Sequence, residues 1–174
     1  MNLLLVKCQR LLAAVSVVFI CATASSARTI SDEVLKSALQ DRYAAMKFAM
    51  AAHNNAAIRS MLAPRFESID VSGHSSGAAQ MIAGLDALQP DPNKVSTTTV
   101  LNLSQVGDKI TVEQRYDMTT KRTSEAGAVH KFELVTVSMD TWVNPVGVWL
   151  LERTVTNSLS IFRDGDLVVH KVKS

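Results

Sequence analysis

The chain has 174 residues, of which 47% are hydrophobic, and its 18 basic and 16 acidic side chains give a formal charge of +2. This length suits one domain with a single hydrophobic core. Both cysteines, Cys8 and Cys21, and two of the basic residues, Lys7 and Arg10, lie near the N-terminus. The rest of the chain is therefore neutral and free of thiols, which excludes disulfides, thiolate chemistry and a charge-driven attraction to nucleic acid there.

The first 27 residues have the three parts of a secretory signal peptide. A basic front precedes an apolar run over 11–22, and small residues over 22–27 provide cleavage sites. The apolar run is shorter than the roughly 20 residues that a membrane-spanning helix needs. We therefore predict a signal peptide over 1–27, a single domain over 28–174 with no membrane partner after cleavage, and a periplasmic or secreted location.

Three helices are predicted in the first half of the remaining chain. The first covers 31–52, with Ser31 as its N-cap, and carries an apolar stripe with Tyr43 beside it. A polar break over 53–55 separates it from a second helix over 56–63, which Pro64 ends. A third short helix is predicted over 78–88.

The strands predominate in the second half. A short strand over 66–71 and a turn over 72–77 separate the second helix from the third. Alternating or β-branched patterns then predict five more strands, over 95–106, 109–120, 129–143, 148–162 and 167–172. Helices followed by hairpin-linked strands favour an α+β fold with a mostly antiparallel sheet. A long twisted sheet can curl around the first helix and form a cone with an interior cavity.

The order of these segments resembles the nuclear transport factor 2-like superfamily, also called SnoaL-like. The resemblance covers about residues 31–170 and includes the Leu62-Ala63-Pro64-Arg65-Phe66 segment. The Asp140-Thr141-Trp142 segment, a turn, and then Gly147-Val148-Trp149 resemble the ending of exported members of unknown function. The resemblance implies a cone in which N-terminal helices pack in a strongly curved sheet. Isomerases, dehydratases, cyclases, binding modules and dimerisation domains share that fold, so it does not assign a function.

Asp70 is the first candidate for chemistry. It lies three residues before Gly73, where the resemblance to the ketosteroid isomerase branch implies a proton-shuttling carboxylate. If Asp70 points into an apolar cone, desolvation raises its pKa and makes it a usable general base. The alternative interpretation is a turn residue that binds the backbone near Ser72 and Gly73.

Tyr43 is the second catalytic candidate, as a hydroxyl that reaches the cavity; the alternative is a core aromatic with a polar tip. The isomerase branch also places a tyrosine and a neutral acid at positions that correspond to Lys47 and Ser138 here. Because neither residue matches, we do not predict steroid isomerisation.

Seven further residues are candidates for lining the cavity. Trp142 and Trp149 have a simpler interpretation as core anchors of two strands, and Asp140 and Glu152 as members of cross-strand ion pairs. The alternation breaks near Glu152, so that either Glu152 or Arg153 is expected to face inward. The full set is Phe66, Tyr116, Asp140, Trp142, Trp149, Glu152 and Thr154. The four histidines lack metal-ligand spacing, so no metal or other cofactor is predicted.

Three functions remain open from the sequence. The first is a module that binds a small apolar or amphipathic molecule in the cone. The second is a general acid–base enzyme of the dehydratase, cyclase or isomerase type, with Asp70 as the base and Tyr43 or Glu152 assisting. The third is a homodimer formed through the outer sheet face, with Thr97, Thr99, Thr111, Glu113 and Arg115 contributing.

Overall fold

The computed structural model describes residues 32–173, so the predicted signal peptide and the Ser31 cap lie outside the described residues. Three helices come first: α1 (Asp32–Ala51), α2 (Asn55–Met61) and, after the first strands, α3 (Ala78–Asp86). Asn54 begins α2, because its side chain accepts a hydrogen bond from the Ala57 N–H at 3.0 Å.

Seven strands form one curved sheet. They are β1 (Leu62–Ile69), β2 (Ser75–Gly77), β3 (Val95–Val106), β4 (Lys109–Thr123), β5 (Val129–Val143), β6 (Leu150–Arg163) and β7 (Asp166–Val172). Their order is β2-β1-β6-β5-β4-β3, and β7 pairs with β6 beyond the end of β1. Only β1 and β6 run parallel; the other pairs are antiparallel. The predicted α+β class and mostly antiparallel sheet are confirmed.

The start of β1 differs from the prediction. The strand begins at Leu62, directly after α2, and Pro64 lies inside it. Proline has no N–H to donate to a sheet, and the pairing of β1 with β6 is irregular between Leu62 and Glu67. Pro64 therefore lies in the irregular stretch of β1 and does not end the second helix, which ends at Met61.

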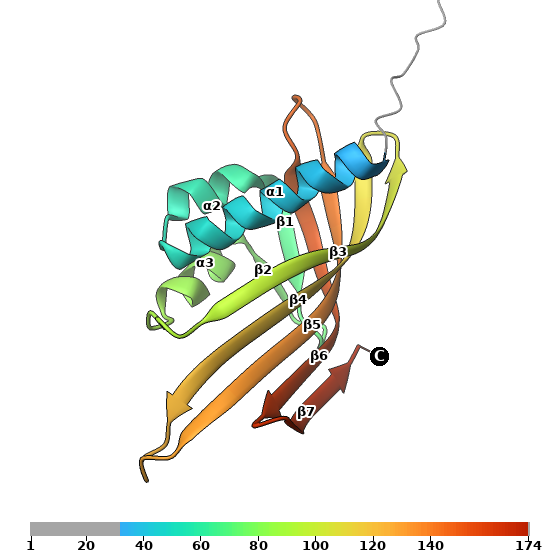
Figure 1. The fold of residues 1–174 in the computed structure, drawn as a ribbon. Helices are drawn as coiled ribbons and strands as arrows, with labels where there is room; N and C mark the ends of the chain where they lie inside the picture. Colours follow the sequence, from blue (N-terminus) through green and yellow to red (C-terminus); the bar gives the residue numbers. More distant parts are fainter. Residues whose placement is uncertain (1–31, 174) are drawn as a thin grey trace, which may run out of the picture.

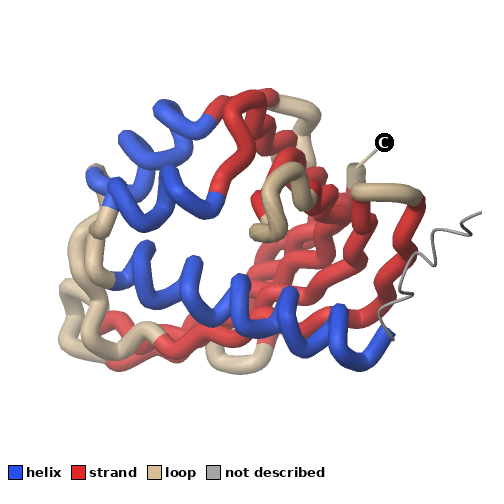
Figure 2. The backbone as a smooth tube through the Cα atoms, turned by 90° about the horizontal axis from the view of Figure 1, so that it is seen from above, coloured by secondary structure: helices blue, strands red, loops and turns tan. Residues whose placement is uncertain are grey.

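The helices cover only part of the concave side of the sheet. α1 runs across the curved sheet with α2 and α3 beside it, while the far ends of β4, β5 and β6 extend beyond the helices (Figures 1 and 2). Lys47 and Gln40 hold α1 to the edge strand by donating hydrogen bonds to the carbonyls of Ser96 and Thr98. The core between α1 and the sheet includes Leu35, Leu39, Ile58, Ile110, Val112 and Trp142.

Two β-bulges in β6 decide which side chains reach the concave face. At the first, Thr141 pairs with Arg153 and Trp142 with Leu151, so Glu152 has no partner. At the second, Val137 pairs with Ser158 and Ser138 with Thr156. Each bulge reverses the alternation and bends the strand. The broken alternation that the sequence shows near Glu152 is therefore the first bulge.

Candidate functional site

A buried polar cluster joins α1 to β5. The Trp142 indole Nε1 donates to the Tyr43 hydroxyl at 3.1 Å, and that hydroxyl donates to Asp140 Oδ2 at 2.7 Å. The two aromatic rings meet edge to face, with centroids 5.3 Å apart. Asp140 is only 2% exposed and Tyr43 8%. Tyr43 faces the sheet because it shares the apolar stripe of α1 with Leu35, Leu39 and Met46.

Burial sets the protonation of this cluster. Desolvation raises the pKa of Asp140 to about 6, while the hydroxyls of Tyr43 and Thr154 act in the opposite direction. Burial, and then the charge of Asp140, raises the pKa of Tyr43, so the phenol stays protonated and donates. Asp140 Oδ1 has no hydrogen-bond partner in the described part of the chain. The cluster thus links α1 to β5 through the two hydrogen bonds of the Tyr43 hydroxyl, and Asp140 takes part in it through Oδ2 alone.

A second feature lies on the uncovered part of the concave face. It is a pocket of about 490 Å³ where β1 leaves the sheet and β7 takes its place beside β6. The second bulge of β6 lies at this junction. The pocket is lined by Asp70, Val71, Ser72, Thr136, Thr156, Leu159, Ile161, Val169 and Lys171.

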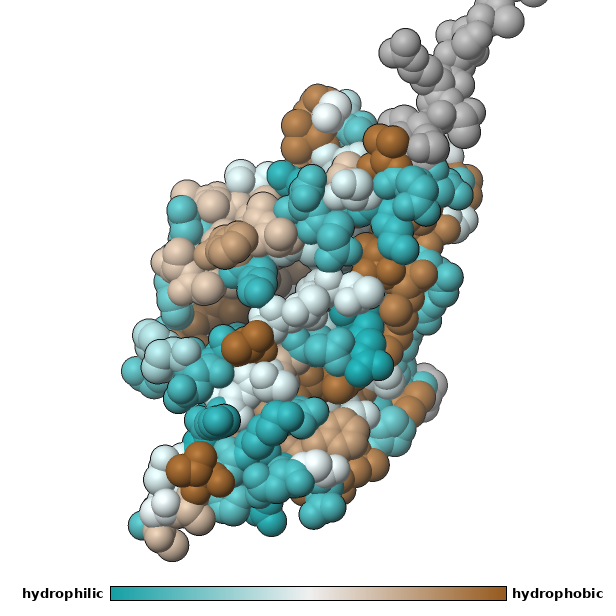
Figure 3. Space-filling view, in the orientation of Figure 1, coloured by the Kyte–Doolittle hydropathy of each residue, from teal (hydrophilic) through white to brown (hydrophobic). Residues whose placement is uncertain are grey.

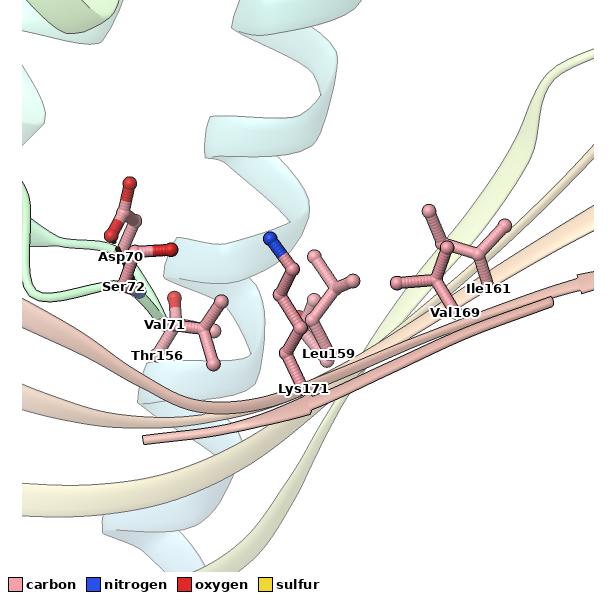
Figure 4. Close-up of a pocket in the computed structure, with 9 residues that line it drawn as sticks. Asp70, Val71, Ser72, Thr156, Leu159, Ile161, Val169 and Lys171 are labelled. Atoms are coloured by element: carbon pink, nitrogen blue, oxygen red, sulfur yellow. Dashed lines mark hydrogen bonds between the residues drawn. The ribbon is translucent and has the colours of Figure 1, made fainter. Parts of the chain in front are cut away.

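The pocket has two chemically different ends (Figure 4). Asp70, Ser72 and Thr156 lie together at one end, whereas Ile161 and Val169 lie at the other. Leu159 and Lys171 lie between them, directly opposite each other on β6 and β7. An apolar floor with a few convergent polar groups is the usual composition of a small-molecule site.

Asp70 does not have the environment that general base catalysis requires. Its carboxylate is exposed, and Oδ1 accepts hydrogen bonds from the backbone N–H of Ser72 at 2.7 Å and of His74 at 3.0 Å. These bonds hold the pKa of Asp70 below its ordinary value, with the His74 bond as the largest cause. Of the two interpretations of Asp70, the structure agrees with the turn residue and not with a desolvated carboxylate of raised pKa: Asp70 organises the turn in which Gly73 has φ +85°.

The other sequence candidates are divided between the core and the surface. Phe66 is buried in the core, and Trp149 is partly buried against it. Tyr116 is half-buried, and Thr154 pairs with Asp140 in the sheet. None of these residues lines the pocket of Figure 4.

Glu152 and Arg153 form ion pairs at the surface. Glu152 contacts the Lys109 ammonium at 2.7 Å, and Arg153 contacts Glu67 at 3.2 Å. The expectation that one of the two faces inward is wrong, because the bulge at Glu152 places Leu151 and Thr154 beside Trp142 and Asp140 instead.

Sequence reasoning missed most of the pocket. Beyond Asp70, its lining comes from the turn after β1, from Thr136 on β5, and from the ends of β6 and β7. The second bulge shifts the alternation of β6 by one residue at this place. The available signal was the alternation of Leu159 and Ile161 with Ser158 and Ser160 along β6. Among the described residues, no group of three or more His, Asp or Glu side chains could hold a metal ion, and no helix is long and apolar enough to cross a membrane.

The outer sheet face that was predicted to dimerise is mixed in character. Arg115 is paired with Asp117 at 2.7 Å and Glu113 accepts from Asn102 at 2.6 Å, so its charges are satisfied within the chain. Figure 3, in the orientation of Figure 1, looks onto the side of the molecule that carries α1, and hydrophobic and hydrophilic residues are interspersed there. No feature of this surface, among the described residues, identifies a binding partner.

Comparison with solved structures finds the same architecture. A scytalone dehydratase-like protein from Novosphingobium aromaticivorans is 12% identical with a TM-score of 0.63, over 81% of this chain and 93% of that one. The association domain of the C. elegans kinase CaMKII is 12% identical with a TM-score of 0.56, over 72% and 97%. A nuclear transport factor 2-like protein from Cytophaga hutchinsonii is 12% identical with a TM-score of 0.50, over 69% and 94%. No protein-family model matches the chain, and no curated protein matches it in sequence.

Proposed function

Since the chain adopts the nuclear transport factor 2-like fold, we propose that it is a binding module that holds a small amphipathic molecule in the pocket of Figure 4. The proteins that share this fold include an enzyme-like protein and an association domain, so the fold is compatible with ligand binding, catalysis or oligomerisation. The choice among them rests on the pocket itself.

The separation of polar and apolar groups within the pocket supports the proposal. Leu159, Ile161 and Val169 offer apolar surface to a ligand body, and the gain from covering such surface is about 25 cal/mol per Å². Ser72 and Thr156 offer hydroxyls to a head group. A volume of about 490 Å³ lies within the range of small-molecule pockets.

The other two functions have less support. General acid–base catalysis by Asp70 is disfavoured, because that carboxylate is exposed and its pKa is lowered. Asp140 has a pKa near neutrality, but it is buried under α1 and does not line the pocket. A homodimer is supported only by the likeness of the fold to an association domain. Light scattering after size-exclusion chromatography tests it directly.

Leu159→Asp is the sharpest test of the pocket. A carboxylate on the apolar floor must be desolvated when an apolar molecule binds, so we expect the affinity for the neutral fluorescent probe N-phenyl-1-naphthylamine to fall at least about tenfold. Fluorescence titration measures the affinity. Ser160→Asp is the matched control: it adds the same charge to the neighbouring residue of β6, whose side chain contacts His170 outside the pocket. Equal affinities of both variants, with unchanged circular dichroism, would count against the pocket.

We further propose that the module works outside the cytoplasm. The composition of the first 27 residues supports this location. When the full chain is expressed in a bacterium, we expect the exported protein to lack these residues, which intact-mass measurement of the periplasmic and cytoplasmic fractions detects. An uncut chain confined to the cytoplasm would exclude export without affecting the pocket.

A further inference from the structure

We infer that Lys171 makes this pocket selective for amphipathic molecules with an anionic head group, such as a carboxylate on an alkyl chain. The inference rests on the proposed function, because it specifies the ligand class of the same pocket. It concerns only the head group of the ligand, so it can be wrong even if the pocket binds a small amphipathic molecule.

The position of Lys171 is the first argument. It lies on β7 directly opposite Leu159, and its side chain rises from the sheet so that the ammonium stands over the pocket (Figure 4). Its aliphatic stem therefore extends the apolar floor, while its ammonium stands between that floor and the polar end of the pocket. A head group next to the ammonium leaves its alkyl chain beside Ile161 and Val169.

The lack of a partner is the second argument. Among residues 32–173, every ion pair within 4.0 Å involves other side chains, and none includes the Lys171 ammonium. By contrast, Lys109, Lys131, Arg115 and Arg153 each contact a carboxylate. Lys171 is thus a cation in the pocket that is available to a ligand.

Asp70 is the one acidic residue of the pocket, and its charge opposes an anion. Its Oδ1 is already engaged by two backbone N–H groups, which stabilise the negative charge locally. The charge of Lys171 contributes a little to the lowered pKa of Asp70, but no ion pair within 4.0 Å joins the two among the described residues. An anionic head group must therefore lie on the Lys171 side, and Asp70→Asn should strengthen its binding, since asparagine keeps an oxygen for the turn and loses the charge.

The experiment compares decanoate with decanol, as monomers at low ionic strength, by isothermal titration. The two share an alkyl chain and differ in the charge of the head group. We expect the unchanged protein to bind decanoate more tightly than decanol. Lys171→Gln should lower the affinity for decanoate about fivefold and change the affinity for decanol by less than about twofold. Lys121→Gln removes the same charge from an exposed site on β4 and should change neither. Lys171→Glu should reverse the preference and favour decylamine.

Each result separates the two proposals. Equal binding of decanoate and decanol, or loss of both in Lys171→Gln, overturns the head-group inference and leaves the pocket intact. The head-group inference is also overturned, and the pocket again left intact, if N-phenyl-1-naphthylamine binds but decanoate does not. If neither the alkyl ligands nor the neutral probe binds, the proposed function itself fails.

Discussion

Replacing Tyr43 with phenylalanine should lower the free energy of unfolding by about 3 kcal/mol at pH 8. The hydroxyl accepts from the Trp142 indole and donates to Asp140, so its removal leaves a buried donor and a buried carboxylate without their partner. Each such group costs about 1–3 kcal/mol, and more when it is charged. The residues involved are at most 8% exposed, so water cannot replace the lost bonds. Urea denaturation monitored by tryptophan fluorescence measures the change.

Tyr116→Phe is the matched control for this experiment. Tyr116 is half-buried on β4, and its hydroxyl makes no hydrogen bond with the described residues. We expect it to cost less than about 1 kcal/mol. If the two variants lost equal stability, the Tyr43 hydroxyl would not be what joins α1 to β5.

Asp140→Asn should change the pH dependence of stability. The pKa of Asp140 in the folded protein, about 6, lies above its ordinary value of 3.8, so the folded state binds this proton more tightly than the unfolded state does. The protonated Asp140 carboxyl therefore contributes its whole stabilisation of the folded state below about pH 4, and this contribution is lost as the pH rises through about 6. The loss amounts to about 3 kcal/mol. Asparagine does not titrate, so the stability of the variant relative to the unchanged protein should rise by that amount between pH 4 and pH 8.

Asp70→Asn provides a control of opposite sign. The pKa of Asp70 is lowered by its backbone hydrogen bonds, so its contribution is present above the ordinary pKa and is lost as the pH falls. Relative to the unchanged protein, this variant should lose stability as the pH rises. Denaturation curves at several pH values measure both differences. An Asp140→Asn difference that stays constant with pH would show that Asp140 is not desolvated.

The long strands were predictable because local pattern and turn chemistry agree there. The bounds predicted for 95–106 and 129–143 coincide with β3 and β5. Both segments are rich in β-branched residues and end at turns that contain glycine or proline. α1 was also predictable, because its apolar stripe fits one helix face.

The pocket could not be predicted from the sequence, because the two bulges of β6 determine which of its side chains face the pocket. A bulge shifts the alternation by one residue. The sequence shows that the alternation breaks near Glu152 but not which residue is inserted, and nothing in the sequence marks the second bulge. Glu152 was therefore expected to have an inward-facing neighbour or to face inward itself, and the second bulge hid the role of Leu159 and Ile161. Similarly, the parallel pairing of β1 with β6, which places Asp70 near Lys171, joins residues far apart in the sequence.

Tyr43 and Asp140 were both named as candidates, but their contact could not be inferred. The two residues are 97 positions apart, and the bond between them depends on the angle at which α1 crosses β5. Tertiary packing also explains why Asp140 is buried without a cation. Its charge is met by the Tyr43 hydroxyl rather than by a cross-strand ion pair, and Arg115 and Arg153 contact other carboxylates.

Methyl nuclear magnetic resonance tests the proposed binding pocket most directly. Decanoate is added to the full chain, and the methyl signals of leucine, isoleucine and valine are followed. Binding in the pocket predicts that the signals of Leu159, Ile161 and Val169 shift together and saturate at one affinity. Shifts confined to core residues under α1, such as Leu39 and Val112, with the three pocket residues unchanged, would contradict the proposal.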